Sequence, residues 1–285
     1  MSASDIDSAI ASAGEGNITL ARKKLLEILE QERKFYKIMG KGSRMKEAEA
    51  LSAYRRINSQ WEAYLLENPD DIEARILFGK FLRKTGNISD AYAQFCIADS
   101  KNPNIAVVKH QMAVFEAETG MAKEAYAHML DALKLQPDNA LYMSQMAKLL
   151  TLGRGTLQEH LGLDNAAYDA KLLSYYSAAA GKLPNDYRIQ ADYALAFYDL
   201  SKADWSAALA QWEKVGKLAA LNVDRQVVLA NKARVLIELN RDAEAEALLE
   251  GVTLPALSDA KNKLLGEIKR ARENAALPKK KSYQY

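Results

Sequence analysis

The sequence predicts an all-α protein, an α-solenoid of stacked helix pairs, from three observations. Pro69, Pro103 and Pro137 follow one another at intervals of 34 residues. Small and apolar residues recur at the same interval between these prolines. Hydrophobic residues make up 49% of the 285-residue chain and charged residues 27%, which is ample for a core beneath a helix-rich surface. A fixed period of this length, with apolar residues at helical spacing, is typical of solenoids built from helix pairs.

The recurring residues form two copies of one pattern. The first copy is Phe78-Gly79, Gly86, Ala91, Phe95 and Ala98, and the second is Met112-Ala113, Gly120, Ala125, Met129 and Ala132. The small residues let the two helices of a unit approach closely, while the larger ones fill the space between them. Gly86 and Gly120 are expected to end the first helices, because glycine adopts the left-handed conformation at little cost. Each proline then follows a second helix, where no backbone N–H is needed.

This pattern resembles the tetratricopeptide repeat family, whose motif is W-x2-L-G-x2-Y, then A-x3-F, then P. The first unit matches it at Phe78-Gly79, Ala91-x3-Phe95 and Pro103, and the second at Ala113, Ala125 and Pro137. Arg75 and Lys109 stand at the tryptophan position, and Glu116 stands at an aromatic one. The resemblance implies a right-handed superhelix with capping helices at both ends and a concave groove lined by the first helix of each unit.

Residues 1–68 form a predicted N-terminal helical cap that contains a divergent repeat. The segment that starts at Gly16 repeats the one that starts at Gly86, since both read Gly-Asn-Ile followed by Thr or Ser. Helices are expected over 5–13, 19–39 and 44–67. The last of them carries one apolar stripe, formed by Met45, Ala48, Leu51, Tyr54, Ile57, Trp61 and Leu65.

Residues 69–254 form the predicted array of about five units, and residues 255–285 add a capping helix and a basic tail. The second helix of the third unit is displaced by an insertion near residues 153–164. Insertions in a solenoid emerge as loops, so this one is expected to protrude and to tolerate shortening. It either carries partner contacts or is a tolerated surface loop. The whole chain is expected to hold about 14 helices and no sheet.

Nothing in the sequence supports catalysis, so we expect no enzyme activity, no cofactor and no metal. His110, His128 and His160 lie far apart and lack partners at metal-ligand spacing. The single cysteine, Cys96, excludes an internal disulfide and fits a reducing compartment, the cytoplasm by default. The N-terminus lacks the pattern of a signal peptide. A net charge of +2 argues against a nucleic-acid partner, and no apolar run reaches the roughly 20 residues needed for membrane insertion.

The sequence favours a non-catalytic protein–protein interaction scaffold or adaptor. The resemblance places its groove on the first helices, at Lys80, Arg83, Lys84, Val107, His110, Gln111, Val114, Gln145, Lys148, Arg188, Leu195, Tyr198, Asn231 and Arg234. Cations outnumber Glu118 and Asp192 on these helices, so the expected partner is a protein or peptide with acidic residues around an apolar anchor, not a small molecule. Two alternatives stay open: a structural subunit of a larger assembly, and a regulatory domain that binds RNA.

Overall fold

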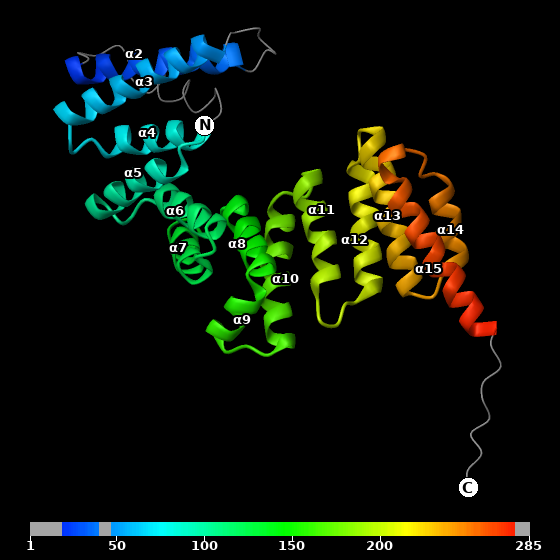
Figure 1. Ribbon diagram of the computed structural model, residues 1–285. Coiled ribbons are helices and arrows are strands. Elements are labelled where there is room, and N and C mark those ends of the chain that lie inside the picture. Colours follow the sequence, from blue (N-terminus) through cyan, green and yellow to red (C-terminus); the bar gives the residue numbers. More distant parts are fainter. Residues whose placement is uncertain (1–18, 40–46, 277–285) are drawn as a thin grey trace. The chain divides into compact units, whose positions relative to one another are not determined.

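The computed structural model describes residues 19–39 and 47–276 (Figure 1). The helix expected over 5–13, the start of the helix expected over 44–67 and the basic tail lie outside these residues. Every regular element within the described ranges is a helix, and fourteen of them are α-helices. This confirms the predicted all-α repeat fold.

Contacts divide the chain between Pro137 and Asp138 into two compact parts, which we call the N-terminal half and the C-terminal half. The array predicted over residues 69–254 crosses this division. The N-terminal half contains α2 (Leu20–Met39), α3 (Glu47–Glu67), α4 (Ile72–Lys84), α5 (Ile88–Lys101), α6 (Ala106–Glu118) and α7 (Ala122–Leu135). α4 packs against α5, and α6 packs against α7. Each pair is therefore one repeat, with a first and a second helix; α2 and α3 pair separately.

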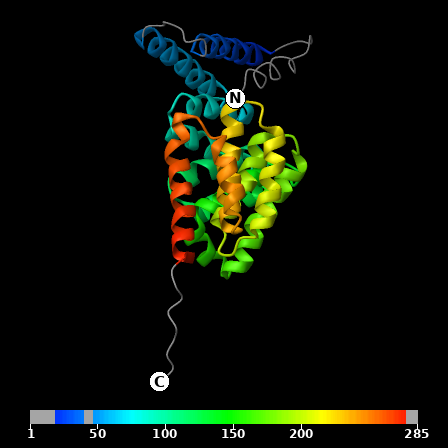
Figure 2. The same cartoon turned by 90° about the vertical axis from the view of Figure 1, so that its right-hand side faces the viewer.

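The C-terminal half continues the pairing with one extra helix. It contains α8 (Ala140–Leu152), α9 (Arg154–Leu161), α10 (Asn165–Lys182), α11 (Tyr187–Ala196), the 3-10 helix η1 (Phe197–Asp199), α12 (Trp205–Leu218), α13 (Asn222–Glu238), α14 (Asp242–Glu250), the 3-10 helix η2 (Pro255–Leu257) and α15 (Ser258–Ala276). α8 pairs with α10, α11 with α12, and α13 with α14. α15 lies beside α13 and α14 (Figure 2) and buries Leu264 and Ile268 there.

Residues in the left-handed conformation close the turn between first and second helices in three repeats. Gly86 has φ of 92° and Gly120 has φ of 83°, as the repeat pattern predicts. Asn240 takes the same place after α13, with φ of 57°. Asparagine tolerates this conformation because its short polar side chain can form local hydrogen bonds.

The two helices of the first repeat meet at positions that carry almost no side chain. Ala91 and Ala98 of α5 are 2% and 0% exposed. A methyl group at Gly79 of α4 would lie 2.8 Å from the Phe95 ring, which is closer than carbon atoms pack without displacement. Ala125 of α7 is also fully buried. The small residues that repeat in the sequence thus set the distance between paired helices.

Polar contacts occupy the positions where the sequence lacks the tryptophan of the family motif. Arg75 of α4 donates from Nη1 to Oε1 of Gln94 on α5 at 3.2 Å. Lys109 of α6 forms an ion pair with Asp99 of α5, with Nζ and Oδ1 2.8 Å apart. Both cations therefore join a first helix to α5, so each departure from the motif still serves helix packing.

The apolar stripe predicted for α3 is buried only in its second half. Ile57 and Trp61 are 1% and 0% exposed, and Leu65 is 7% exposed. Leu51, near the start of the helix, is 45% exposed. Leu51 lines an open pocket, which is described below.

The insertion forms a packed helix, α9, and the predicted protruding loop is wrong. Leu157 of α9 is fully buried and approaches Gly153 so closely that a methyl group there would lie 3.0 Å from its side chain. Nη2 of Arg154 donates to Oδ1 of Asp169 on α10 at 2.5 Å. Oδ2 of Asp169 also accepts the backbone N–H of Ser201 at 2.9 Å. The segment is thus tied to two neighbouring parts of the C-terminal half.

Replacing Ala91 by leucine should overpack the contact between α4 and α5. We expect Ala91→Leu to lower the free energy of unfolding by roughly 1–3 kcal/mol, because the added atoms have no free volume beside Phe78 and Phe95. Urea denaturation followed by circular dichroism measures this. Ala93→Leu is the matched control, since Ala93 is exposed on the same helix. Equal stability of the two variants would contradict the packing described here.

Truncating Leu157 should reveal that α9 is part of the core. Leu157→Ala is expected to cost about 2–5 kcal/mol, the range for removing a fully buried leucine side chain. Leu152 lies five positions earlier and is 88% exposed, so Leu152→Ala should change stability little. If Leu157→Ala were as stable as Leu152→Ala, the insertion would be a dispensable loop after all.

Candidate functional site

The predicted groove residues of the N-terminal half lie on α4 and α6, and we call their exposed faces the first-helix surface of this half. Lys80 and Arg83 are partly buried, and Lys84 is exposed. Val107, Gln111 and Val114 are also partly exposed. The side chains at these positions are therefore accessible to a partner.

His110 does not belong to this surface, and the expectation that it contacts a partner is wrong. The side chain is 7% exposed. Burial, aided by the positive charge of Arg83, lowers the pKa of His110 to about 4. The imidazole is therefore neutral at pH 7 and packs inside the N-terminal half. The sequence placed His110 at the surface because helical spacing alone does not show which neighbouring residues cover a side chain.

Two of the three predicted cations in this half contact neighbouring helices. Nη2 of Arg83 on α4 forms an ion pair with Oε1 of Glu118 on α6 at 2.7 Å. Nζ of Lys84 lies 3.5 Å from the centre of the Tyr36 ring on α2. Lys80 has no ion pair with any described residue, so its charge is the one of the three that stays uncommitted.

The C-terminal half shows the same arrangement on α8, α11 and α13. Nζ of Lys148 on α8 forms an ion pair with Oδ2 of Asp192 on α11 at 2.6 Å. The guanidinium carbon of Arg234 on α13 lies 4.0 Å from the centre of the Tyr198 ring. The Tyr198 hydroxyl donates to the backbone oxygen of Asn231 at 3.0 Å. Predicted cations thus join first helices here too.

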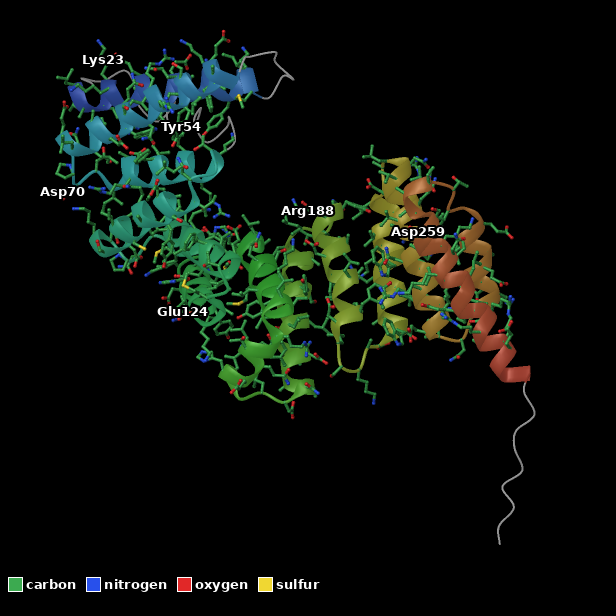
Figure 3. All side chains as sticks on the ribbon, viewed as in Figure 1. Lys23, Tyr54, Asp70, Glu124, Arg188 and Asp259 are labelled. Carbon is green, nitrogen blue, oxygen red and sulfur yellow. The ribbon has the colours of Figure 1, made fainter. Side chains whose placement is uncertain are left out.

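Three other predicted positions of this half are open to a partner. Leu195 is 44% exposed, and Gln145 is partly exposed. Arg188 projects from the first turn of α11 (Figure 3) and pairs with no described acidic residue. The basic excess expected from the sequence is therefore reduced to a few uncommitted charges, chiefly Lys80 and Arg188 on their separate halves.

A buried carboxyl group, missed at the sequence level, lies next to the first-helix surface of the N-terminal half. Glu32 of α2 is fully buried, and Nε1 of Trp61 donates to its Oε1 at 2.5 Å. Its Oε2 has no hydrogen-bond partner within the described ranges. Burial raises the pKa of Glu32 to about 8, against the Trp61 hydrogen bond and the positive charge of Lys84. Glu32 is therefore mainly protonated at pH 7.

Glu116, which stands at an aromatic position of the family motif, is the second buried acidic residue. Glu116 is 1% exposed. Its Oε1 accepts from the Tyr92 hydroxyl at 2.8 Å, and its Oε2 lies 2.8 Å from Nδ1 of His128. Both partners come from second helices, so this cluster joins α6 to α5 and α7 and serves the packing of the half.

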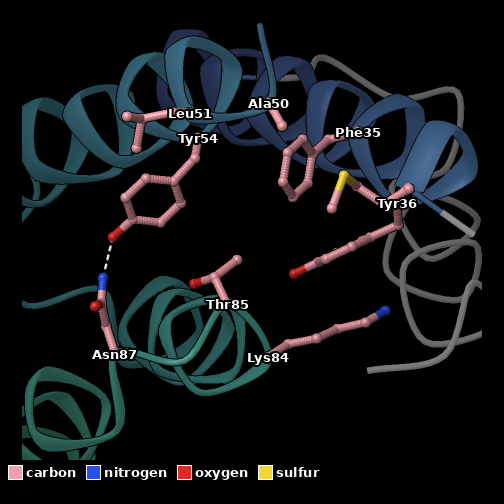
Figure 4. Close-up of a pocket in the computed structure, with 9 residues that line it drawn as sticks. Phe35, Tyr36, Ala50, Leu51, Tyr54, Lys84, Thr85 and Asn87 are labelled. Atoms are coloured by element: carbon pink, nitrogen blue, oxygen red, sulfur yellow. Dashed lines mark hydrogen bonds between the residues drawn. The ribbon is translucent and has the colours of Figure 1, made fainter. Parts of the chain in front are cut away.

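An apolar pocket of about 600 Å³ opens between α2, α3 and the end of α4 (Figure 4). Its lining comprises Phe35, Tyr36, Met39, Ala50, Leu51, Tyr54, Lys84, Thr85 and Asn87. The amide of Asn87 donates to the Tyr54 hydroxyl, and the Tyr54 ring stacks on Phe81 with centroids 5.7 Å apart. These contacts hold one wall in place. Met39, which also lines the pocket, is 54% exposed.

The sequence analysis placed Leu51 and Tyr54 on one apolar stripe of a helix and predicted no pocket there. The available signal was the aromatic pair Phe35-Tyr36 on one long helix and Tyr54 on the next, both near the Gly40-to-Ser43 break. Periodicity indicates which residues share a face, but it does not show whether enough side chains exist to fill the space between faces.

The described ranges contain no group of three or more His, Cys, Asp or Glu side chains suited to hold a metal ion. None of the helices in those ranges is long and apolar enough to cross a membrane. Cys96 is half-buried, and burial raises the pKa of its thiol. The described helices, joined by ion pairs and hydrogen bonds, therefore present exposed surfaces and a pocket that a partner could bind.

The buried Glu32 predicts a pH dependence of stability. Below about pH 4.5 the group is protonated in both the folded and the unfolded chain. As the pH rises toward 8, the unfolded chain loses a proton that the folded chain retains, so stability falls by up to about 1.4 kcal/mol per pH unit. Glu32→Gln cannot titrate, so its advantage over the wild type should grow between pH 5 and 8 in urea denaturation. A constant difference would contradict a protonated Glu32.

No protein-family model and no curated protein matches the sequence at a significant level. Solved structures are similar in fold. The C-terminal part of a TPR repeat-containing protein from Cytophaga hutchinsonii aligns with a TM-score of 0.60 at 15% identity, over 93% of this chain and 93% of that chain. PilW, described as a widely conserved type IV pilus biogenesis factor, aligns with a TM-score of 0.60 at 13% identity, over 87% and 99%.

YrrB, described as a TPR protein with an unusual peptide-binding site, aligns with a TM-score of 0.56 at 15% identity, over 75% of this chain and 97% of that chain. At such identities the similarity concerns the fold. The motif resemblance and these structures agree, and the chain has the fold of tetratricopeptide repeat proteins.

Proposed function

We propose that the protein is a non-catalytic interaction scaffold that binds a peptide segment or protein partner on its first-helix surfaces. The observation that carries the proposal is the apolar pocket that opens beside Lys84, at the end of the predicted surface of α4. A volume of about 600 Å³ suits one or two large side chains and falls within the range of small binding sites. A partner would place its apolar anchor there.

Charge supports an acidic partner. Lys80 precedes Lys84 by one helical turn on α4 and is uncommitted, so both ammonium groups can steer carboxylates toward the pocket mouth. In the other half, Arg188 is uncommitted, and exposed Leu141 and Leu195 supply apolar contact on α8 and α11. The apolar contacts would supply most of the affinity, and the charges the specificity.

The neighbours support binding as the general activity. YrrB is described by its peptide-binding site, and PilW by a part in pilus biogenesis. RNA binding is disfavoured as an alternative, because Arg83, Lys148 and Arg234 are engaged within the fold and leave few charges for phosphates.

A structural role in an assembly is the second candidate. It is favoured by two exposed leucines that are not among the predicted groove residues, Leu66 on α3 and Leu152 at the end of α8, which are 84% and 88% exposed. Exposed leucines of this kind are buried when a subunit packs against another protein. Concentration-dependent mass of the purified chain, measured by sedimentation, would favour this candidate over the scaffold.

Blocking the pocket should abolish partner binding. Leu51→Trp fills the pocket with a larger side chain, and Leu66→Trp adds the same side chain to an exposed position of the same helix. We expect partners captured from lysate by the wild type to fall roughly tenfold or more with Leu51→Trp, the loss typical of a central anchor, and to persist with Leu66→Trp. Circular dichroism confirms that both variants fold.

Charge reversal tests the second part of the proposal. Lys80→Glu should slow association with the partner and weaken its capture. Lys123→Glu, at an exposed position of α7, should do neither. If Leu51→Trp and Lys80→Glu both retain the full set of captured partners while folded, the first-helix surface is not the binding site. Loss with Leu66→Trp alone would instead favour the assembly role.

A further inference from the structure

A second cavity, of about 500 Å³, lies entirely within the C-terminal half and outside the first-helix surfaces. It opens between the second helices α10 and α12 and the start of α11. Its lining comprises Ser177, Ala180, Gly181, Pro184, Asn185, Gln190, Tyr193, Gln211, Lys214, Lys217 and Leu218. We propose that this cavity binds an acidic, extended segment of a partner protein, through the backbone of the segment at the floor and its carboxylates at the rim.

The floor is built from two buried glutamines. Gln190 and Gln211 are each 4% exposed. Nε2 of Gln190 donates to the backbone oxygens of Ala180 at 2.7 Å and Leu183 at 3.1 Å. Nε2 of Gln211 donates to Oε1 and to the backbone oxygen of Gln190, at 2.8 and 3.1 Å. Every amide hydrogen at the floor is therefore directed into the protein, and the network fixes both side chains.

One acceptor remains at this floor. Oε1 of Gln211 has no hydrogen-bond partner among the described residues, yet it is not one of the buried polar atoms sealed from solvent. Since Gln211 lines the cavity, this oxygen faces it. An oxygen held in this way accepts a hydrogen bond from an N–H donor, and a backbone amide of an extended segment supplies one.

The rim carries the charge that selects the segment. Lys214 and Lys217 are exposed in the last two turns of α12, and neither forms an ion pair with a described residue. The exposed Ser177 and Asn185 add neutral hydrogen-bonding groups, and neither side chain forms a hydrogen bond with a described residue. Two uncommitted ammonium groups beside an apolar wall of Pro184 and Leu218 complement carboxylates flanking an aliphatic side chain.

The cavity shares no residue with the pocket of the N-terminal half or with the predicted groove, so its test is independent of the proposed function. The probe is the peptide fluorescein-Gly-Asp-Glu-Leu-Asp-Glu-Gly-amide, labelled at its N-terminal amine. It is titrated against the full chain and followed by fluorescence anisotropy at low and at moderate salt. The matched probe replaces each Asp and Glu by Asn and Gln. We expect the acidic probe to bind and the neutral probe to bind at least about tenfold more weakly.

Two pairs of variants locate the binding. Ser177→Trp fills the cavity from an exposed position of α10, and Ser174→Trp is its control, one turn earlier on the exposed surface. Lys214→Gln/Lys217→Gln removes the rim charge, and Lys123→Gln/Lys202→Gln is its control. We expect Ser177→Trp to weaken binding roughly tenfold or more, and the rim pair to weaken it about three- to tenfold and to flatten its salt dependence.

Unchanged affinity with Ser177→Trp, or equal binding of the neutral probe, would overturn the proposal. So would a single-stranded RNA oligonucleotide that binds with the same variant profile, because the cavity would then be a phosphate site. A chain that binds the probe normally while Leu51→Trp abolishes capture from lysate would support this site and the proposed function together. Loss of probe binding only with Leu51→Trp would refute this site and leave the proposed function standing.

Discussion

The close approach of paired helices is the constraint on which the rest of the structure depends. The Phe95 ring occupies the space that a side chain at Gly79 would need, and Ala91 and Ala125 are buried where second helices meet first helices. Because the residues at these positions are small, the paired helices pack closely. The same close packing recurs in successive repeats, as the small residues do in the sequence. The turns at Gly86 and Gly120 follow from the same requirement, because each helix must reverse at once to pack on its partner.

A second consequence concerns charge. Successive first helices lie near enough for long cationic side chains to bridge them, and Arg83, Lys148 and Arg234 do so. Such contacts are modest in energy at an exposed surface, but they remove those charges from the set offered to a partner. In the function that we propose, the groups left for a partner are Lys80 and Arg188, together with the pocket beside Lys84.

The fold could be predicted because its determinants are local and periodic. Small residues, turn glycines and Asn240 all act within one helix pair, so their spacing carries the information. The candidate sites could not be predicted, since they depend on what lies between elements. His110 is buried within the N-terminal half, α9 is packed through Leu157, and the floor of the second cavity rests on hydrogen bonds between Gln190 and Gln211 of different helices. No spacing within one helix encodes these distances.

Photo-crosslinking from the pocket tests the central claim, that the protein holds a partner on its first-helix surface, most directly. A benzoylphenylalanine side chain in place of Leu51 would lie at the pocket, and in place of Leu66 it would lie elsewhere on the same helix. Irradiation in lysate, followed by mass spectrometry of the crosslinked peptide, identifies both the partner and its contacting residues. The account predicts a discrete crosslink from position 51, to an apolar residue with acidic neighbours, and none from position 66. A crosslink from position 66 alone would contradict it.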